Sequence, residues 1–206
     1  MSIVINGDGS ISGISVGGLP DGTVDAGTLA TNSVDSAELV DGSIDTAHIG
    51  TDQITSAILP AGSILQIQKA GTFSTHTSTA NSFGDTTMSV GITPSSTSSK
   101  IVIAWGAMSM ITGGASALRM GFKVIRKVSG GSDTALVNTT ESMELLQVRG
   151  TPSEVNAPIT GVWLDEPSTT SAITYMYQIR KHPDTTQAIL LSSSHGSQMI
   201  AYEIKG

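Results

Sequence analysis

Residues 21–60 read DGTVDAGTLATNSVDSAELVDGSIDTAHIGTDQITSAILP and repeat one ten-residue phrase four times without a break. Large apolar residues recur at the fourth position of each decad (Val24, Val34, Ile44, Ile54) and at the ninth (Leu29, Leu39, Ile49, Leu59). A spacing of five residues suits neither a helix nor a strand, because two side chains five positions apart point to different faces in both. Each decad must therefore combine more than one kind of local structure.

Two further positions of the decad predict what that structure is. The second position holds the residue types that most readily adopt a left-handed backbone: Gly22, Asn32, Gly42 and Asp52. The fifth position holds Asp25, Asp35 and Asp45, which suit the cap of a short helical turn, with Thr55 as a weaker cap. Asp35 with Glu38 also fits a capping-box variant. We expect a short extended piece, an Asp-capped helical turn and a left-handed exit.

The decads are poor in apolar side chains. Two large apolar residues in ten cannot offset an ordering cost of about 1 to 2 kcal/mol per residue, so the repeats must bury these groups against other copies. Residues 21–60 are therefore predicted to form a fibrous, homo-oligomeric shaft. The alternative is a disordered acidic linker, which would not need so regular a pattern.

The segment before the decads, residues 1–20, alternates apolar residues around Asn6-Gly7 and Asp8-Gly9. Such dipeptides favour tight turns, so we expect a hairpin or strand cap there. The turn at Asp8 lacks the further acidic residues of a calcium loop, and no metal is assigned to it.

Charge is unevenly distributed. The net charge is −7, but residues 1–60 contain eight acids and no Lys or Arg, whereas residues 61–206 carry a net +1. An acidic chain without a basic stripe argues against nucleic-acid binding. The chain has no Cys, and its longest aliphatic or aromatic run, IVIAW at 101–105, is far shorter than a membrane span. We therefore expect neither disulfides nor membrane insertion.

Residues 61–206 change to a period of two, which indicates strands. The expected strands begin at AGSILQIQ and continue at 88–92, 100–105, 118–124, 134–140, 142–149, 159–164, 172–180, 187–192 and 198–204. Short strands separated by Gly, Pro and Ser turns predict an antiparallel β-sandwich, with a jelly roll as the favoured wiring. The whole chain is thus expected to be all-β.

Several phrases resemble the tail-fibre proteins of marine and cyanobacterial phages: IDTAHIGTDQIT, ITPSSTSSKIVI, VWLDEPSTTSAITYMYQIR and the terminal MIAYEIKG. The resemblance implies a homotrimeric virion tail fibre that assembles in the host cytoplasm. Its N-terminal part would bind other virion tail proteins, and its C-terminal head would attach to a host cell-surface glycan or protein. The alternative is a structural or decoration fibre without direct receptor binding. That family shares no universal functional residues.

The sequence contains no HExxH pattern, and no enzyme is predicted. Ser194 and His195 are adjacent and are expected to form a polar turn. Of the acidic pairs, Glu141 with Glu144 and Asp165 with Glu166, the second is expected to point to opposite faces of a strand. His48 could form a ring of histidines around a shaft axis and hold an ion, although a solvated His is the simpler interpretation. No catalytic residue, cofactor or metal site is assigned.

Binding residues are expected in loops of the head, because loops on a rigid scaffold can vary without disturbing its core. Lys181 and His182 precede Pro183 in an expected turn, and Arg149 enters the loop RGTPSEVNAP. These three residues are the candidate receptor contacts. The aromatic residues Trp105, Trp163, Tyr175 and Tyr177 could stack on sugars, but their strand positions favour core packing.

The first prediction concerns the oligomeric state. We expect light scattering on the full chain to give the mass of a homotrimer, because the decads cannot bury their apolar groups within one chain. A monodisperse monomer that still melts cooperatively would contradict the predicted shaft.

Overall fold

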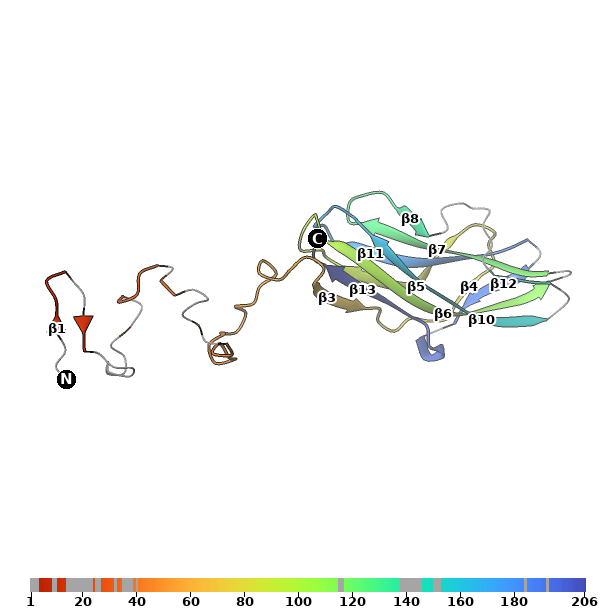
Figure 1. Ribbon diagram of the computed structural model, residues 1–206. Helices are drawn as coiled ribbons and strands as arrows, with labels where there is room; N and C mark the ends of the chain where they lie inside the picture. The colour runs from red at the N-terminus through yellow and green to blue at the C-terminus, as the bar shows by residue number, and fades with distance from the viewer. Residues whose placement is uncertain are drawn as a thin grey trace. The chain divides into compact units, whose positions relative to one another are not determined.

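The computed structural model describes residues 4–8, 11–13, 24, 27–31, 33–34, 39, 41–114, 117–137, 146–149, 153–183, 185–191 and 193–206. These belong to two compact units, residues 1–54 and residues 55–206 (Figure 1). In the first unit, β1 (Val4–Ile5) pairs antiparallel with β2 (Ile11–Ser12), which confirms the predicted N-terminal hairpin. Among the described residues, no helix is long and apolar enough to cross a membrane.

The described decads repeat the same pair of turns. One turn joins the fifth and eighth positions, as in the bond from His48 N to Asp45 O (3.1 Å) and its equivalent from Ile58 N to Thr55 O (3.2 Å). The other joins the tenth position to the third of the next decad, as from Gln53 N to Gly50 O (3.2 Å). The Asp45 side chain accepts a hydrogen bond from Ala47 N (2.9 Å), as expected of a cap.

The second position of the decad has the predicted left-handed backbone where it is described. Gly42 has a φ of 78° and Asp52 a φ of 63°. Gly62 keeps the same spacing with a φ of 89°. A positive φ at the third residue of a four-residue turn is typical of type II, which Gly, Asn and Asp tolerate best. Asn32 and Gly22 lie outside the described residues.

Large apolar side chains of the decads in residues 1–54 lie at the surface of the single chain. Their exposed fractions run from 39% to 55%, for Val24, Leu29, Val34, Leu39, Ile44, Ile49 and Ile54. In a single chain, these apolar side chains are therefore about half exposed to solvent.

Residues 55–206 form two antiparallel sheets. The six-stranded sheet contains β3 (Ile64–Lys69), β4 (His76–Ser78), β6 (Lys100–Gly114), β10 (Glu154–Asp165), β12 (Thr185–Leu190) and β13 (Gln198–Ile204). The five-stranded sheet contains β5 (Gly84–Ile92), β7 (Ala117–Val128), β8 (Thr134–Val137), β9 (Leu146–Arg149) and β11 (Ile173–Lys181). A short 3-10 helix, η1 (Ser193–His195), connects β12 to β13.

The strand order is that of a jelly roll. Strand β6 pairs with β10 along one edge and with β13 and β12, one after the other, along its second edge. Strands β3 and β4 lie beyond β13 and β12, and β8 and β9 share one edge of β7. If β3 with β4, β12 with β13, and β8 with β9 are each counted as one interrupted strand, the sandwich has eight strands in chain order. The six-stranded sheet then has the order first-eighth-third-sixth, and the five-stranded sheet has the order second-seventh-fourth-fifth. The predicted antiparallel sandwich and its favoured wiring are confirmed.

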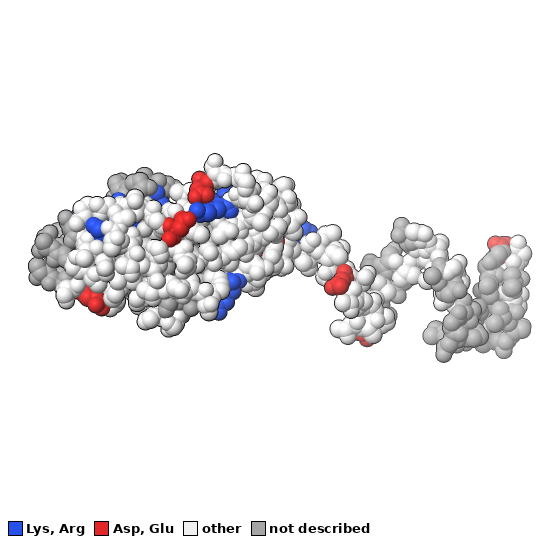
Figure 2. Space-filling view, turned by 180° about the vertical axis from the view of Figure 1, so that it is seen from behind, with Lys and Arg blue, Asp and Glu red and all other residues white. Residues whose placement is uncertain are grey.

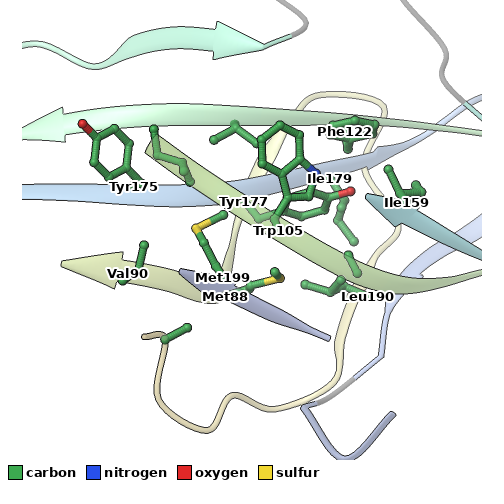
Figure 3. Packing of buried hydrophobic residues seen from close by; sticks show 14 of the residues in the cluster. Met88, Val90, Trp105, Phe122, Ile159, Tyr175, Tyr177, Ile179, Leu190 and Met199 are labelled. Atoms are coloured by element: carbon green, nitrogen blue, oxygen red, sulfur yellow. The ribbon is translucent and has the colours of Figure 1, made fainter. Parts of the chain in front are cut away.

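The core lies between the two sheets and receives side chains from both (Figure 3). At its centre the ring of Phe122 stacks on Tyr177 with centroids 5.2 Å apart and meets Trp105 edge-on at 6.5 Å. Gly161 lies under Trp105, since a Cβ at that position would stand 2.3 Å from the indole ring. The prediction of core packing is confirmed for Trp105, Tyr175 and Tyr177, which are at most 6% exposed.

For Trp163 the prediction of core packing is wrong. Its side chain is 42% exposed. Strand β10 is an edge strand that pairs with β6 alone. Its side chains therefore have a neighbouring strand on one side only, and Trp163 is partly open to solvent on the other.

A buried carboxylate holds the loop between β5 and β6. Glu203 is fully buried, and its Oε1 accepts hydrogen bonds from Ser95 N (2.7 Å), Ser95 Oγ (2.6 Å) and Ser99 Oγ (2.6 Å). Its Oε2 accepts one from Gln66 Nε2 (2.6 Å). Burial alone would raise the pKa of this carboxyl group, but the hydrogen bonds from Ser95, Ser99 and Gln66 outweigh it and hold the pKa below its ordinary value.

The second prediction is that Glu203→Gln destabilises the sandwich in a pH-dependent way. Because the folded pKa is lowered, the carboxylate contributes stability above the unfolded pKa, and this contribution is lost as the pH falls through the folded pKa. We expect the variant to lose about 1 to 3 kcal/mol of unfolding free energy at neutral pH. In urea titrations the difference from wild type should shrink towards acidic pH. The exposed Glu154→Gln is the control, and a difference that does not change with pH would contradict the prediction.

Candidate functional site

One end of the sandwich holds the last half-decad and the C-terminal residues, and the other end holds strand-connecting turns. At the end where β6 begins, Lys205 Nζ donates to the carbonyls of Ala57 (3.2 Å) and Leu59, and Gly62 N donates to Lys205 O (2.8 Å). The last half-decad is thus fixed beside the C-terminus. At the opposite end, here called the distal end, β6 ends at Gly114 and β12 begins at Thr185 (Figure 1).

All three candidate contacts lie at the distal end. Arg149 closes β9 and pairs with Ala117, the first residue of β7; its side chain lies outside what the structure describes. Lys181 is the last residue of β11, and its Nζ donates to Asn81 Oδ1 (2.8 Å) and, more weakly, to His182 O (3.5 Å). The structure therefore brings these residues to one end of the five-stranded sheet, with β7 between β11 and β9.

The turn that carries His182 is anchored to both sheets. His182 N donates to Arg119 O (3.3 Å), and Thr185 N donates to His182 O (2.9 Å). The buried Thr185 hydroxyl accepts from Arg119 N (2.8 Å) and donates to Arg119 O (2.9 Å). Since Thr185 begins β12 and Arg119 belongs to β7, this contact joins the two sheets beside the turn. The turn is held in a defined position.

Beside this turn lies a group of cations from β7 and β11, here called the cation cluster: Arg119, Lys123, Arg180 and Lys181. The Nζ of Lys123 stands 4.4 Å from the centroid of the Phe83 ring, and the guanidinium of Arg180 stands 5.0 Å from it. Arg180 Nη1 also donates to Asn81 O (3.3 Å). Arg119 lies on the same side of β7 as Lys123, four residues away along the strand.

A glycine allows this arrangement. Gly121 lies between Arg119 and Lys123 on β7 and pairs with Arg180 across the sheet. A Cβ there would stand 2.9 Å from Arg180 Nε and 3.0 Å from the Phe83 ring. The missing side chain therefore lets Phe83 and Arg180 lie against the strand.

The cation cluster was not predicted from the sequence. The alternation of Arg119, Gly121 and Lys123 on one face of a strand was a usable signal. The partners Phe83 and Arg180 lie far from them in the sequence, however, and the register of β7 against β11 is needed to bring them together.

The other candidate chemical groups do not converge. Asp165 is buried and accepts from Arg126 Nη1 (2.8 and 3.0 Å) and from Tyr175 Oη (2.7 Å), while Glu166 pairs with Lys100 at the surface (3.0 Å). Burial and the Asp165 carboxylate raise the pKa of the Tyr175 hydroxyl, which therefore donates. The prediction that Asp165 and Glu166 point in different directions is confirmed. Glu141 and Glu144 lie outside the described residues.

Ser194 and His195 lie in η1, where Ser194 Oγ stands 3.3 Å from His195 Nδ1. Both residues are exposed, so the contact belongs to a polar surface turn, as predicted.

In the part of the chain that the structure describes, no group of three or more His, Asp or Glu residues could hold a metal ion. His48 Nδ1 lies 2.8 Å from Asp45 Oδ1 within its own decad, and both side chains are more than half exposed.

Charged side chains are few and scattered on the face of the sandwich shown in Figure 2. Only 13% of all residues are charged. Against this background, four cations on neighbouring parts of β7 and β11, two of them against the Phe83 ring, are a local concentration of positive charge. Cationic groups, an amide and exposed backbone can bind polar or acidic ligands.

Comparisons with known proteins found no matching family model and no matching curated protein. A chain from the structure of infectious bursal disease virus Gx strain aligns with a TM-score of 0.37 and 15% identity, over 68% of this chain and 33% of that one. A chain from the T13 IBDV viral particle aligns with a TM-score of 0.31 and 13% identity, over 67% of this chain and 34% of that one. The chain thus matches about a third of the length of these viral chains.

The CBM22-1 xylan-binding domain from Paenibacillus barcinonensis Xyn10C aligns with a TM-score of 0.28 and 12% identity, over 72% of this chain and 99% of that domain. At TM-scores this low, none of these similarities assigns a function.

The third prediction tests the ring at the centre of the cation cluster. Phe83→Leu keeps an apolar side chain but removes the π face under Lys123 and Arg180, so we expect a loss of about 1 kcal/mol of unfolding free energy in urea titrations. Phe83→Tyr retains the ring and is expected to keep most of the stability. Equal losses in the two variants would show that Phe83 acts only as an apolar filler.

Proposed function

We propose that this chain is a homotrimeric virion tail-fibre protein whose jelly-roll head attaches to the host cell surface through its distal end. The observation that carries the proposal is the separation of the two ends of the sandwich. The last half-decad and the C-terminus are fixed at one end, and the turns with Arg149, Lys181 and His182 lie at the other.

The decads support a stalk that other copies complete. They repeat the same two turns and leave their large apolar residues about half exposed. Sister chains around a common axis would cover these residues, and the N-terminal part would bind other tail proteins of the virion. The sequence resemblance to phage tail fibres supports the same interpretation.

The expected ligand is a polar or acidic glycan of the host surface. Arg and Lys side chains suit the hydroxyl and carboxylate groups of such a ligand. Three copies of the distal end would present three equal sites, and linked sites gain from effective concentration, so each site can be shallow and weak.

One observation favours the alternative of a structural or decoration fibre. Lys181 Nζ already binds Asn81, so this lysine contributes to holding the turn. In the structural alternative the distal end would pack against other virion proteins and would bind no receptor.

The fourth prediction separates the two functions. We expect the fluorescently labelled full chain to adsorb to cells of a host that the parent virus infects. The triple substitution of Arg149, Lys181 and His182 to Ala should lower that adsorption by about tenfold or more, because three copies of the site are weakened at once. Lys100→Ala, at the opposite end of the sandwich, is the matched control.

Circular dichroism and light scattering must show that each variant is folded and trimeric. Unchanged adsorption by the triple variant would discard the three residues as contacts. A correctly folded wild-type chain that does not adsorb would favour the structural function.

A further inference from the structure

Strand β6 is apolar on both of its faces. Its inner side chains, such as Ile101, Ile103 and Trp105, are buried in the core. Its outer side chains alternate with them and include Val102 and Ala104, which are half-buried. A strand that is apolar on both faces is typical of a sheet covered on both sides. In the single chain, one side is covered.

The neighbouring strands extend this apolar outer surface. Across the sheet, the register places four residues in one row: Ile67, Tyr202, Val102 and Leu164. The next row contains Ile200, Ala104 and Val162 and ends at Lys69 on the edge strand β3. These seven apolar residues are here called the apolar face.

Exposure shows that the apolar face is uncovered. Val162 is 68% exposed, Ile67 is 57% exposed and Leu164 is 52% exposed. Ile64, at the start of β3 beside these rows, is 54% exposed. Large contiguous apolar patches on a protein surface mark sites of association.

The outer surface of the five-stranded sheet has the opposite character. Arg119, Lys123 and Lys127 lie on this surface at every fourth residue of β7, with the buried Ile125 between the last two. Asp85 on β5 accepts from Lys127 Nζ (2.8 Å) and Gln178 Nε2 (2.7 Å). Arg119, Lys127 and Asp85 are at least partly exposed, as suits contact with water. The two outer surfaces of the sandwich are therefore unequal, and the apolar one lacks its cover.

We propose that the apolar face packs against the same face of other copies of this chain, around the axis of the homotrimer. The proposal rests on the proposed tail-fibre function, because it takes the trimer from there and assigns the surface that faces the axis.

The absence of charge on the apolar face fits a second copy as its occupant. An interface around a symmetry axis brings identical residues close together, so charges at its centre would repel one another. The seven residues of the apolar face carry no charge, and Lys69 lies at its margin. The cation cluster on the other sheet would bring like charges together in the same arrangement.

The size of the apolar face limits how much of the interface it can form. Its two rows lie two residues apart, about 7 Å along the strands, and cross four strands about 4.8 Å apart. This is less than the roughly 800 Å² that a standard interface buries on each partner, so the decads would supply further contact area in the proposed trimer.

The surface is also continuous with the segment that leads to the decads. Strand β3 carries Ile64 and Ile67 and follows directly after residues 55–63, in which Ile58 is 62% exposed. Sister chains that cover the sheet are thus positioned to cover the last half-decad.

Cross-linking of the full chain tests the proposal. The chain has no Cys, so Val162→Cys introduces one thiol at the β10 end of the apolar face, where the side chain is 68% exposed. A short bismaleimide at low protein concentration should convert this variant to covalent dimers. The matched control is Thr87→Cys, an exposed position on β5 of the other sheet, which should remain uncross-linked. Adding Leu164→Glu to Val162→Cys should reduce the cross-linked fraction about tenfold or more, whereas Leu164→Met should retain it.

Each result has a defined meaning. Circular dichroism first establishes that a variant is folded. If the wild-type chain is a trimer by mass but Val162→Cys cross-links no better than Thr87→Cys, the apolar face is not at the axis and only this proposal is overturned. If the wild-type chain is a monomer, the face binds a different partner, and both this proposal and the homotrimer are overturned.

Discussion

The two-sided apolar character of strand β6 is the constraint on which the rest of the sandwich depends. Its 15 residues pair with β10 along one edge and with β13 and β12 along the other, so it sets the register of three strands at once. Its inner residues supply Trp105 and three isoleucines to the core. Gly161 on β10 leaves room for the indole ring of Trp105 because it has no side chain. Phe122 on β7 contacts the same ring edge-on.

Polar side chains are distributed around this strand according to what each surface must contact. The outer surface of the five-stranded sheet carries a cation at every fourth residue of β7, and the distal end carries turns held by buried hydrogen bonds such as those of Thr185. The opposite end is fixed by Lys205 and by the hydrogen bonds to Glu203. Defined turns on a rigid scaffold are the usual place of binding residues, and hydrogen bonds at the other end secure the connection to the decads.

Local patterns in the sequence predicted most of the fold. The period of two gave residues 198–204 as a strand, and β13 has those bounds. The second position of the decad predicted the positive φ of Gly42 and Asp52, because few residue types tolerate it. Long-range pairing could not be predicted in this way. Trp163 is exposed because β10 is an edge strand, and the cation cluster needs the pairing of β7 with β11. Both depend on strand order, which a period of two does not contain.

In the proposed trimer, the decads and the sandwich would stabilise each other's association. The decads have too few apolar groups to order alone, and the sandwich has a complete core but one uncovered sheet surface. Once three sandwiches meet through the apolar face, their decads start from one place at a high effective concentration, so little additional entropy is lost when they pack together. Association of the decads in turn raises the effective concentration of the sandwiches. Two interfaces that are each weak can therefore form a stable trimer, because they are joined in the same chain.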